Sequence, residues 1–182
     1  FYIVDLDASD SYKEIALYGE GEDGEPITYF LRYRDGGLSL VGSVTDNPVS
    51  DTCHFQNDGE TNGGIVASFK LSVLQQWYAQ GYWRLSDGGK LSYESQSIYY
   101  PVRTYEAELL CELPVYTAQD REGEKFTVKP GKVTFTATDN KNWVQLETQD
   151  NVLGWFYVEN YDTIADVGKK AEEVFNFLTS DV

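Results

Sequence analysis

Two Asp-Gly-Gly triplets, at residues 35–37 and 87–89, constrain the fold of this chain more than any other feature. Aspartate and glycine tolerate the positive φ angles that tight hairpin turns require. The first triplet separates "ITYFLRYR" from "LSLVGSV", two runs rich in β-branched and aromatic residues. These runs predict a β-hairpin, and the second triplet predicts another turn of the same kind.

The rest of the chain continues this β pattern. Short apolar runs such as "FYIV" and "EIALYGE" alternate with polar turns, and Thr134, Thr136 and Thr138 alternate with apolar residues. Such alternation is typical of antiparallel strands with one wet face. Residues 45 to 64 are polar and contain Pro48, which predicts a long loop. The expected fold class is therefore mainly β.

Only the end of the chain has helical spacing. Apolar side chains recur there every three or four residues, at Ile164, Val167, Ala171, Val174, Phe175 and Leu178. This spacing predicts one amphipathic helix from about residue 163 to residue 178. Asp162 or Thr163 would cap its start, and Gly168 would weaken it.

Composition excludes some classes of partner. Of 182 residues 30 are acidic and 14 basic, so the net charge of −16 disfavours nucleic acid and anionic membranes. No apolar run is long enough to span a bilayer, so no transmembrane segment is expected. The chain begins at Phe1 and contains no Met, from which we expect a mature form or fragment that has lost its leader. Cys53 and Cys111 permit either one disulfide, bridging two domains of an exported protein, or two free thiols.

The two triplets also belong to a faint repeat. "RYRDGGLSL" begins at Arg32 and "RLSDGGKLSY" begins at Arg84, 52 positions later. A period near fifty residues suits propeller-like blades of antiparallel strands. The alternative, which the sequence slightly favours, is that unrelated hairpins use the same turn.

The stretch "DLDASDSYKEIAL", residues 5 to 17, resembles the aspartate loops of FG-GAP/VCBS-type repeats in secreted bacterial proteins. Asp5 and Asp7 match the first two ligands of the family pattern, and Ser9 stands at the third. Lys13 replaces the last acid, with Glu14 one residue beyond, and the central glycine is missing. The resemblance covers about the first hundred residues.

That resemblance implies calcium, which prefers several hard oxygen ligands. The candidate metal ligands are Asp5, Asp7, Ser9, Asp10 and Glu14. The alternative is that these side chains cap backbone amides in a turn. No other cofactor is expected.

Residues 107 to 160 resemble a bacterial SH3-type (SH3b-like) domain, a small five-stranded barrel. The matching motifs are Pro114-Val115-Tyr116, Pro130-Gly131-Lys132, Trp143-Val144 and Gly154-Trp155-Phe156-Tyr157-Val158. The arginine of the early strand in peptide-binding members is missing. The two resemblances place an acidic antiparallel, partly propeller-like β domain at residues 1–104. They place an SH3-like barrel with the terminal helix at residues 105–182.

SH3-type domains are usually accessory modules of exported bacterial proteins, so the resemblance implies an extracellular or cell-surface location. The implied partners are a cell-wall peptide, a glycan or another envelope protein. The candidate ligand-binding side chains are Tyr116, Trp143, Trp155 and Tyr157. The alternative is that Trp143 and Trp155 belong to the core.

No motif indicates catalysis. His54 follows Cys53 directly, and adjacent residues of an extended strand point to opposite faces, which argues against a Cys-His dyad. The sequence has no nucleophile elbow, phosphate-binding loop or zinc pattern. The first hypothesis is therefore a non-catalytic binding or scaffold module of an exported bacterial protein, and association with the cell envelope is part of that hypothesis. The second is a carboxylate-based hydrolase of polysaccharide or cell-wall material.

Overall fold

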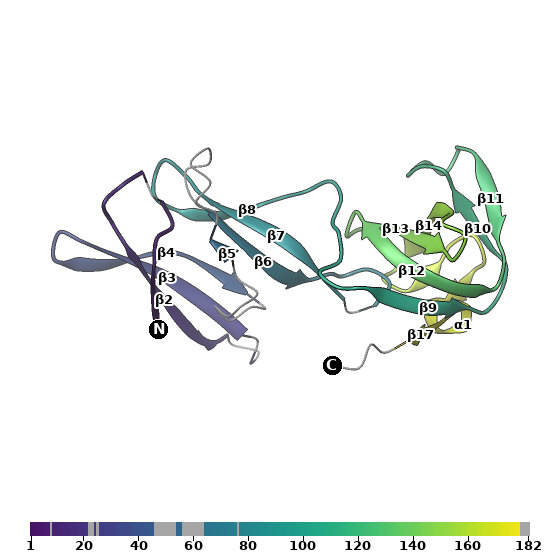
Figure 1. Ribbon diagram of the computed structural model, residues 1–182, viewed down its shortest axis with the longest axis horizontal. Helices are drawn as coiled ribbons and strands as arrows, with labels where there is room; N and C mark the ends of the chain where they lie inside the picture. Colours follow the sequence, from purple (N-terminus) through teal and green to yellow (C-terminus); the bar gives the residue numbers. More distant parts are fainter. Residues whose placement is uncertain are drawn as a thin grey trace. The chain divides into compact units, whose positions relative to one another are not determined.

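The computed structural model describes residues 1–7, 9–21, 24, 26–45, 54–55, 64–75 and 77–178 of the chain. Antiparallel strands dominate these residues, which confirms the predicted mainly β fold class (Figure 1). None of the helices in these segments has the length and apolar character needed to cross a membrane.

The chain forms two compact units that interleave along the sequence. The first unit comprises residues 1–69 and 80–95, and the second comprises residues 70–79 and 96–182. Sequence analysis placed a single boundary between residues 104 and 105. In the structure that position lies inside the second unit, just before its strand β9 (Tyr105–Leu109).

The first sheet of the first unit has four strands in chain order. They are β1 (Tyr2–Val4), β2 (Glu14–Glu20), β3 (Pro26–Arg34) and β4 (Gly37–Thr45), each antiparallel to the next. Asp35 and Gly36 join β3 to β4 with φ angles of 52° and 83°. Positive φ at both central residues characterises a type I′ turn, so the predicted hairpin is confirmed.

The second sheet of the first unit repeats this plan. Its strands, again in chain order, are β5 (His54–Phe55), β6 (Gly64–Lys70), β7 (Tyr78–Leu85) and β8 (Leu91–Glu94). Gly89, with a φ of 72°, closes the turn between β7 and β8. Both Asp-Gly-Gly triplets therefore lie at the turn between the third and fourth strands of a four-stranded sheet. The turns themselves differ, because Arg34 pairs with Gly37 across residues 35–36, whereas Leu85 pairs with Leu91 across residues 86–90.

The two sheets of the first unit share one hydrophobic core. The first sheet and the loop after β1 contribute Val4, Leu6, Ala16, Phe30, Val41 and Val44, and the second sheet contributes Ile65, Ala67, Trp83 and Leu85. Ile65 and Ala67, like Trp83 and Leu85, are two apart as the pleat requires, whereas Val41 and Val44 are three apart because the β3–β4 pairing is irregular at Val41. One face of each sheet is thus buried against the other sheet.

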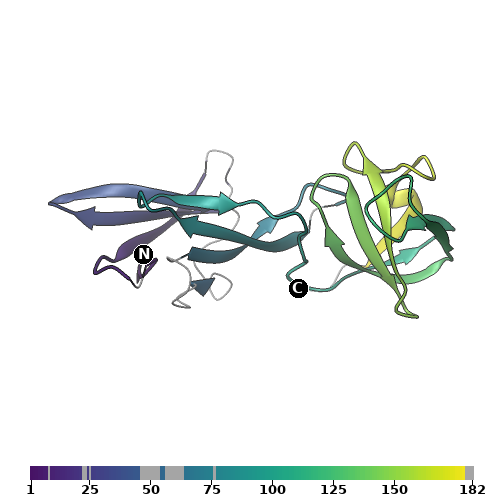
Figure 2. The ribbon, with the colours of Figure 1, turned by 90° about the horizontal axis from the view of Figure 1, so that it is seen from above.

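The second unit is a strongly curved antiparallel sheet, drawn from teal to yellow in Figures 1 and 2. Besides β9 it contains β10 (Leu113–Tyr116), β11 (Lys125–Val128), β12 (Gly131–Thr138), β13 (Trp143–Thr148), β14 (Leu153–Glu159), β15 (Thr163–Ile164), β16 (Lys169–Lys170) and β17 (Phe175–Leu178). The strand order is β11-β10-β14-β13-β12-β9-β17, and β15 pairs with β14 and β16. The described pairings run as an open path from β11 to β17.

The predicted terminal helix is real but far shorter than expected. α1 covers only Ala171–Val174, and strands β15, β16 and β17 occupy most of the remaining span. A continuous helix over residues 163 to 178 is therefore wrong. Gly168 has a φ of 63°, outside the helical region, and Phe175 and Phe177 pair with β9 opposite Leu109 and Ala107. Hydrogen bonds to β9 thus replace helical ones at the end of the chain.

The proposed disulfide cannot be located, because Cys53 lies outside the described residues. Cys111 is half-buried and makes no disulfide with any residue in the described segments. Of His54 the structure describes only the backbone, at the start of β5.

Candidate functional site

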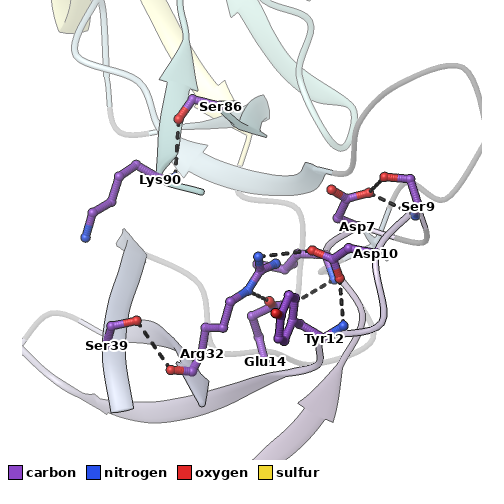
Figure 3. Close-up of polar contacts among 10 residues, drawn as sticks. Asp7, Ser9, Asp10, Tyr12, Glu14, Arg32, Ser39, Ser86 and Lys90 are labelled. Carbon is purple, nitrogen blue, oxygen red and sulfur yellow. Dashed lines mark hydrogen bonds and ion pairs between the residues drawn. The ribbon is translucent and has the colours of Figure 1, made fainter. Parts of the chain in front are cut away.

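The acidic loop lies between two antiparallel strands, as the sequence predicts. β1 pairs with β2 so that Tyr2 faces Ala16 and Val4 faces Glu14. The loop between them carries the candidate metal ligands, and Figure 3 shows how most of them are held.

Glu14, the first residue of β2, holds the loop from its buried side. Its side chain is fully buried, with one carboxylate oxygen accepting a hydrogen bond from the Leu6 amide at 3.0 Å. The other oxygen accepts one from Arg32 Nε at 2.5 Å. Arg32 Nη1 in turn lies 3.0 Å from Asp10 Oδ2, so a single guanidinium joins two of the predicted ligands (Figure 3). Charge-assisted bonds of this kind hold the loop against β3.

Asp7 and Asp10 cap turns of the loop by accepting backbone amides. Asp7 Oδ1 accepts hydrogen bonds from the Ser9 hydroxyl at 2.5 Å and the Ser9 amide at 2.9 Å. These two bonds hold the pKa of Asp7 below its ordinary value. Asp10 Oδ1 accepts the Tyr12 amide at 2.8 Å, and Asp5 forms an ion pair with Lys13.

The five candidate metal ligands are therefore not gathered around one point. Arg32 brings Asp10 and Glu14 together, whereas Asp5 pairs with Lys13, and Asp7 with Ser9. Across the described residues no three Asp, Glu, His or Cys side chains are arranged to hold a metal ion. The turn-capping alternative accounts for the contacts of Asp7 and Asp10. Calcium binding stays a prediction.

A polar hollow of about 370 Å³ lies between the acidic loop and the β7–β8 turn. It is lined by Asp7, Ser9, Asp10, Arg32, Arg34 and residues 85 to 89. The guanidinium carbons of Arg32 and Arg34 lie 5.3 and 5.2 Å from the centre of the Tyr12 ring. Sequence reasoning missed these two arginines as site residues, although the repeat begins at Arg32.

The aromatic candidates of the second unit divide by burial. Tyr116 and Trp143 are buried and meet edge to face, with ring centres 5.2 Å apart. Trp143 meets the half-buried Tyr157 in the same way at 5.1 Å, and Tyr116 pairs across the strands with the half-buried Trp155. The predicted residues are thus neighbours, with two of the four rings inside the unit.

Charged side chains flank this aromatic cluster. The Tyr116 hydroxyl donates to Asp166 Oδ1 at 3.0 Å, and Lys125 Nζ donates to the same oxygen at 2.9 Å. Interactions with Tyr116 and Asp166 raise the pKa of Lys125. The guanidinium of Arg121 lies over the Tyr157 ring at 4.7 Å. These contacts order the side chains around the cluster.

A third surface, which the sequence analysis did not single out, is the outer face of the first sheet. Ala16 and Phe30 point into the core, so the residues beside them point outward. Ile3 pairs with Ile15, Ile15 with Leu31, and Leu31 with Leu40, which makes one aliphatic row across all four strands. We define the outer face by this row together with Leu17, Ile27, Tyr29, Tyr33 and Leu38.

Five of the nine side chains of the outer face are exposed, whereas Ile15, Ile27, Tyr29 and Leu31 are half-buried. Ile3 is 62% exposed, and the cross-strand pair Tyr33 and Leu38 is 60% and 59% exposed. None of the nine side chains that define it carries a charge, in a chain with a net charge of −16.

Comparisons of the chain with protein-family models, with curated proteins and with solved structures found no match in any of the three.

Proposed function

We propose that the chain is a non-catalytic binding or scaffold module of an exported bacterial protein, placed at the cell envelope, and that it binds another protein through the outer face of its first sheet. The observation that carries the proposal is the uncharged, exposed character of that face. Monomeric soluble proteins rarely expose large contiguous apolar patches, and such patches commonly mark interaction sites. The acidic remainder of the surface keeps the chain soluble around it.

Two acids of the acidic loop, Glu14 and Asp10, are already bonded to other groups of the chain, which supports a non-catalytic role for this loop. A general acid or base needs access to its substrate. Glu14 is fully buried and bonded to Leu6 and Arg32, and Asp10 is bonded to Arg32 and Tyr12. The contacts that stabilise the loop occupy these carboxylates, so they are not free to act on a ligand.

The support for the envelope location is the sequence resemblance of residues 107 to 160 to SH3-type domains. The motifs of that resemblance lie on neighbouring antiparallel strands, with Trp143 of β13 opposite Tyr157 of β14. Tyr116 of β10 lies opposite Trp155 of β14. Because Tyr116 and Trp143 are buried, we assign binding to the first unit and to a protein partner rather than to a wall glycan.

Photo-crosslinking in intact cells tests this function. A photoreactive phenylalanine analogue is placed at Tyr33, on the outer face, and in a control chain at Tyr161, which is 45% exposed in the second unit. We expect a covalent adduct with a protein from Tyr33 and none from Tyr161. Equal labelling from both positions, no adduct from Tyr33, or recovery of the chain from the cytoplasm would contradict the proposal.

A further inference from the structure

Strand β11 lies at one end of the curved sheet of the second unit, and its pairing with β10 fixes which of its backbone groups are used (Figure 1). The Thr117 amide donates to the Glu124 carbonyl at 3.1 Å, just before β11 begins. Along an antiparallel ladder, pairs that exchange hydrogen bonds alternate with pairs that exchange none. Three residues beyond Glu124, Thr127 belongs to a pair of the second kind, and its partner Pro114 has no amide hydrogen to donate.

The backbone groups of Lys125 and Thr127 consequently point away from β10. Their N–H and C=O groups face the free edge of β11, since within the part of the chain that the structure describes this strand pairs only with β10. Both residues are exposed. A row of unpaired backbone donors and acceptors on an exposed edge is the binding surface for another extended strand.

A groove of about 360 Å³ follows this edge. It is lined by residues 126–133, residues 148–150 and Val152. Because side chains alternate between the two faces of a strand, a groove that touches consecutive residues of β11 runs along the strand rather than over one face. Phe126, Val128, Val133 and Val152 make part of the lining apolar. The side chains of an added strand that lie opposite Phe126 and Val128 would point to the same side as these two.

Charge selects the kind of strand that fits this edge. Lys129 lines the groove and forms no ion pair with any residue in the segments that the structure covers. Pairing two copies of β11 antiparallel about Thr127 would set Lys125 of one copy opposite Lys129 of the other. Like charges directly opposite one another destabilise a pair of strands, whereas opposite charges stabilise it. The lysines therefore disfavour a second copy and favour a strand that carries acids.

We propose that the free edge of β11 binds an extended, acidic segment of another protein, which adds a strand to the sheet and lays aliphatic side chains in the groove. Lys125 and Thr127 bond to the backbone of that segment, and Lys129 pairs with one of its carboxylates. This edge is in the second unit, whereas the outer face is in the first. The inference therefore goes beyond the proposed function and does not rest on it.

NMR titration of the whole chain with two capped peptides tests the inference. The probe alternates valine with glutamate, and the control peptide alternates valine with lysine. We expect the valine–glutamate peptide to shift the amide resonances of Lys125 and Thr127. We also expect it to bind at least about fivefold more tightly than the control peptide, because its charges complement the edge.

Two pairs of variants separate the backbone contact from the charge contact. Thr127→Pro removes the outward amide but no bond to β10, and it should weaken binding at least about fivefold, because a peptide carbonyl loses its donor. Thr127→Ala keeps that amide and should bind as the wild type does. Lys129→Glu should also weaken binding, whereas its control Lys141→Glu, in the turn after β12, lies at the other end of that strand from the groove. Circular dichroism checks that Thr127→Pro keeps its strands, as edge positions allow.

Several outcomes would overturn the inference. They are no binding of the valine–glutamate peptide at millimolar concentration, equal affinity for the two peptides, or binding that neither Thr127→Pro nor Lys129→Glu weakens. Resonance shifts confined to β1–β4 would overturn it and support the outer face instead. A dimer that Thr127→Pro abolishes would make a second copy the occupant. Crosslinking from Tyr33 does not depend on Thr127, so a failure of the proposed function is seen separately.

Discussion

At the scale of single residues, the first unit depends on a buried ion pair. Removing the acceptor of a buried hydrogen-bond donor costs about 1–3 kcal/mol. We expect Glu14→Ala to lower the free energy of unfolding of the first unit by that amount, because it leaves the buried Leu6 amide without its acceptor, whereas Arg32 keeps its ion pair with Asp10. Urea unfolding followed by circular dichroism measures the change. Glu20→Ala, at the exposed end of the same strand, is the control and should cost less than about 0.5 kcal/mol.

Asp7 permits a prediction about pH. Ser9 holds the pKa of this carboxyl below its ordinary value, so Ser9→Ala should raise it toward that value. A lowered native pKa contributes stability above the unfolded pKa, and this contribution is lost as pH falls through the native pKa. The advantage of the wild type over Ser9→Ala should therefore shrink on acidification. Carbon NMR titration of the Asp7 carboxyl measures the shift, and an unchanged pKa in Ser9→Ala would refute the assignment.

The sequence located the acidic loop but not the partners of its side chains. The alternative that these side chains cap backbone amides in a turn depends on local contacts, and Asp7 makes one by accepting the Ser9 amide. The partner of Glu14 is Arg32, 18 positions further along on another strand. Pairing across strands depends on register, which acid spacing within a loop does not contain.

At the scale of elements, the turns were the most predictable feature. Gly89 ends the β7–β8 turn with a φ of 72°, whereas the neighbouring Gly88 has no positive φ. We expect Gly89→Ala to cost about 1 kcal/mol because a Cβ is disfavoured at that angle. Gly88→Ala, whose added Cβ would come no closer than 3.8 Å to Ser86, should be tolerated. Thermal melts of the two variants compare them, and equal losses would mean that backbone angle is not the cause.

The long terminal helix predicted over residues 163 to 178 does not form, and the reason lies outside its own sequence. Its apolar residues have helical spacing, but Phe175 and Phe177 are also two apart, as a strand with one inward face requires. The free edge of β9 decides between the two patterns, because it supplies backbone hydrogen bonds to β17. Propensity along a short segment cannot report the presence of such an edge.

At the scale of the whole molecule, the second unit includes residues 70–79, which contain the last residue of β6 and the first two residues of β7. Trp77 is fully buried there, donates to the Val73 carbonyl at 2.9 Å, and packs edge to face on Tyr105. We expect Trp77→Ala to destabilise the second unit by about 3–5 kcal/mol. Denaturation monitored by amide hydrogen exchange should show lost protection in β9 and β12 and unchanged protection in β2 and β3. Loss confined to β2 and β3 would contradict the assignment.

The division into units was beyond sequence reasoning for a related reason. The composition of residues 70–79 resembles that of the flanking strands, and a buried tryptophan can serve either core. A boundary drawn once along the chain assumes that each unit is continuous. Long-range contacts assign this segment to the second unit: Trp77 packs on Tyr105 and Phe135, and the Ser72 amide donates to Asn140 Oδ1 at 2.7 Å.

The interleaving of the two units bears on how such a chain can be inherited. The polypeptide leaves the first unit after Phe69 and returns to it at Gln80. No single break in the chain, or in the gene that encodes it, therefore yields both units whole. A crossover after Ser95 would transfer β1 to β8 with Trp77 stripped of its aromatic neighbours. A single crossover therefore cannot transfer one unit whole without part of the other.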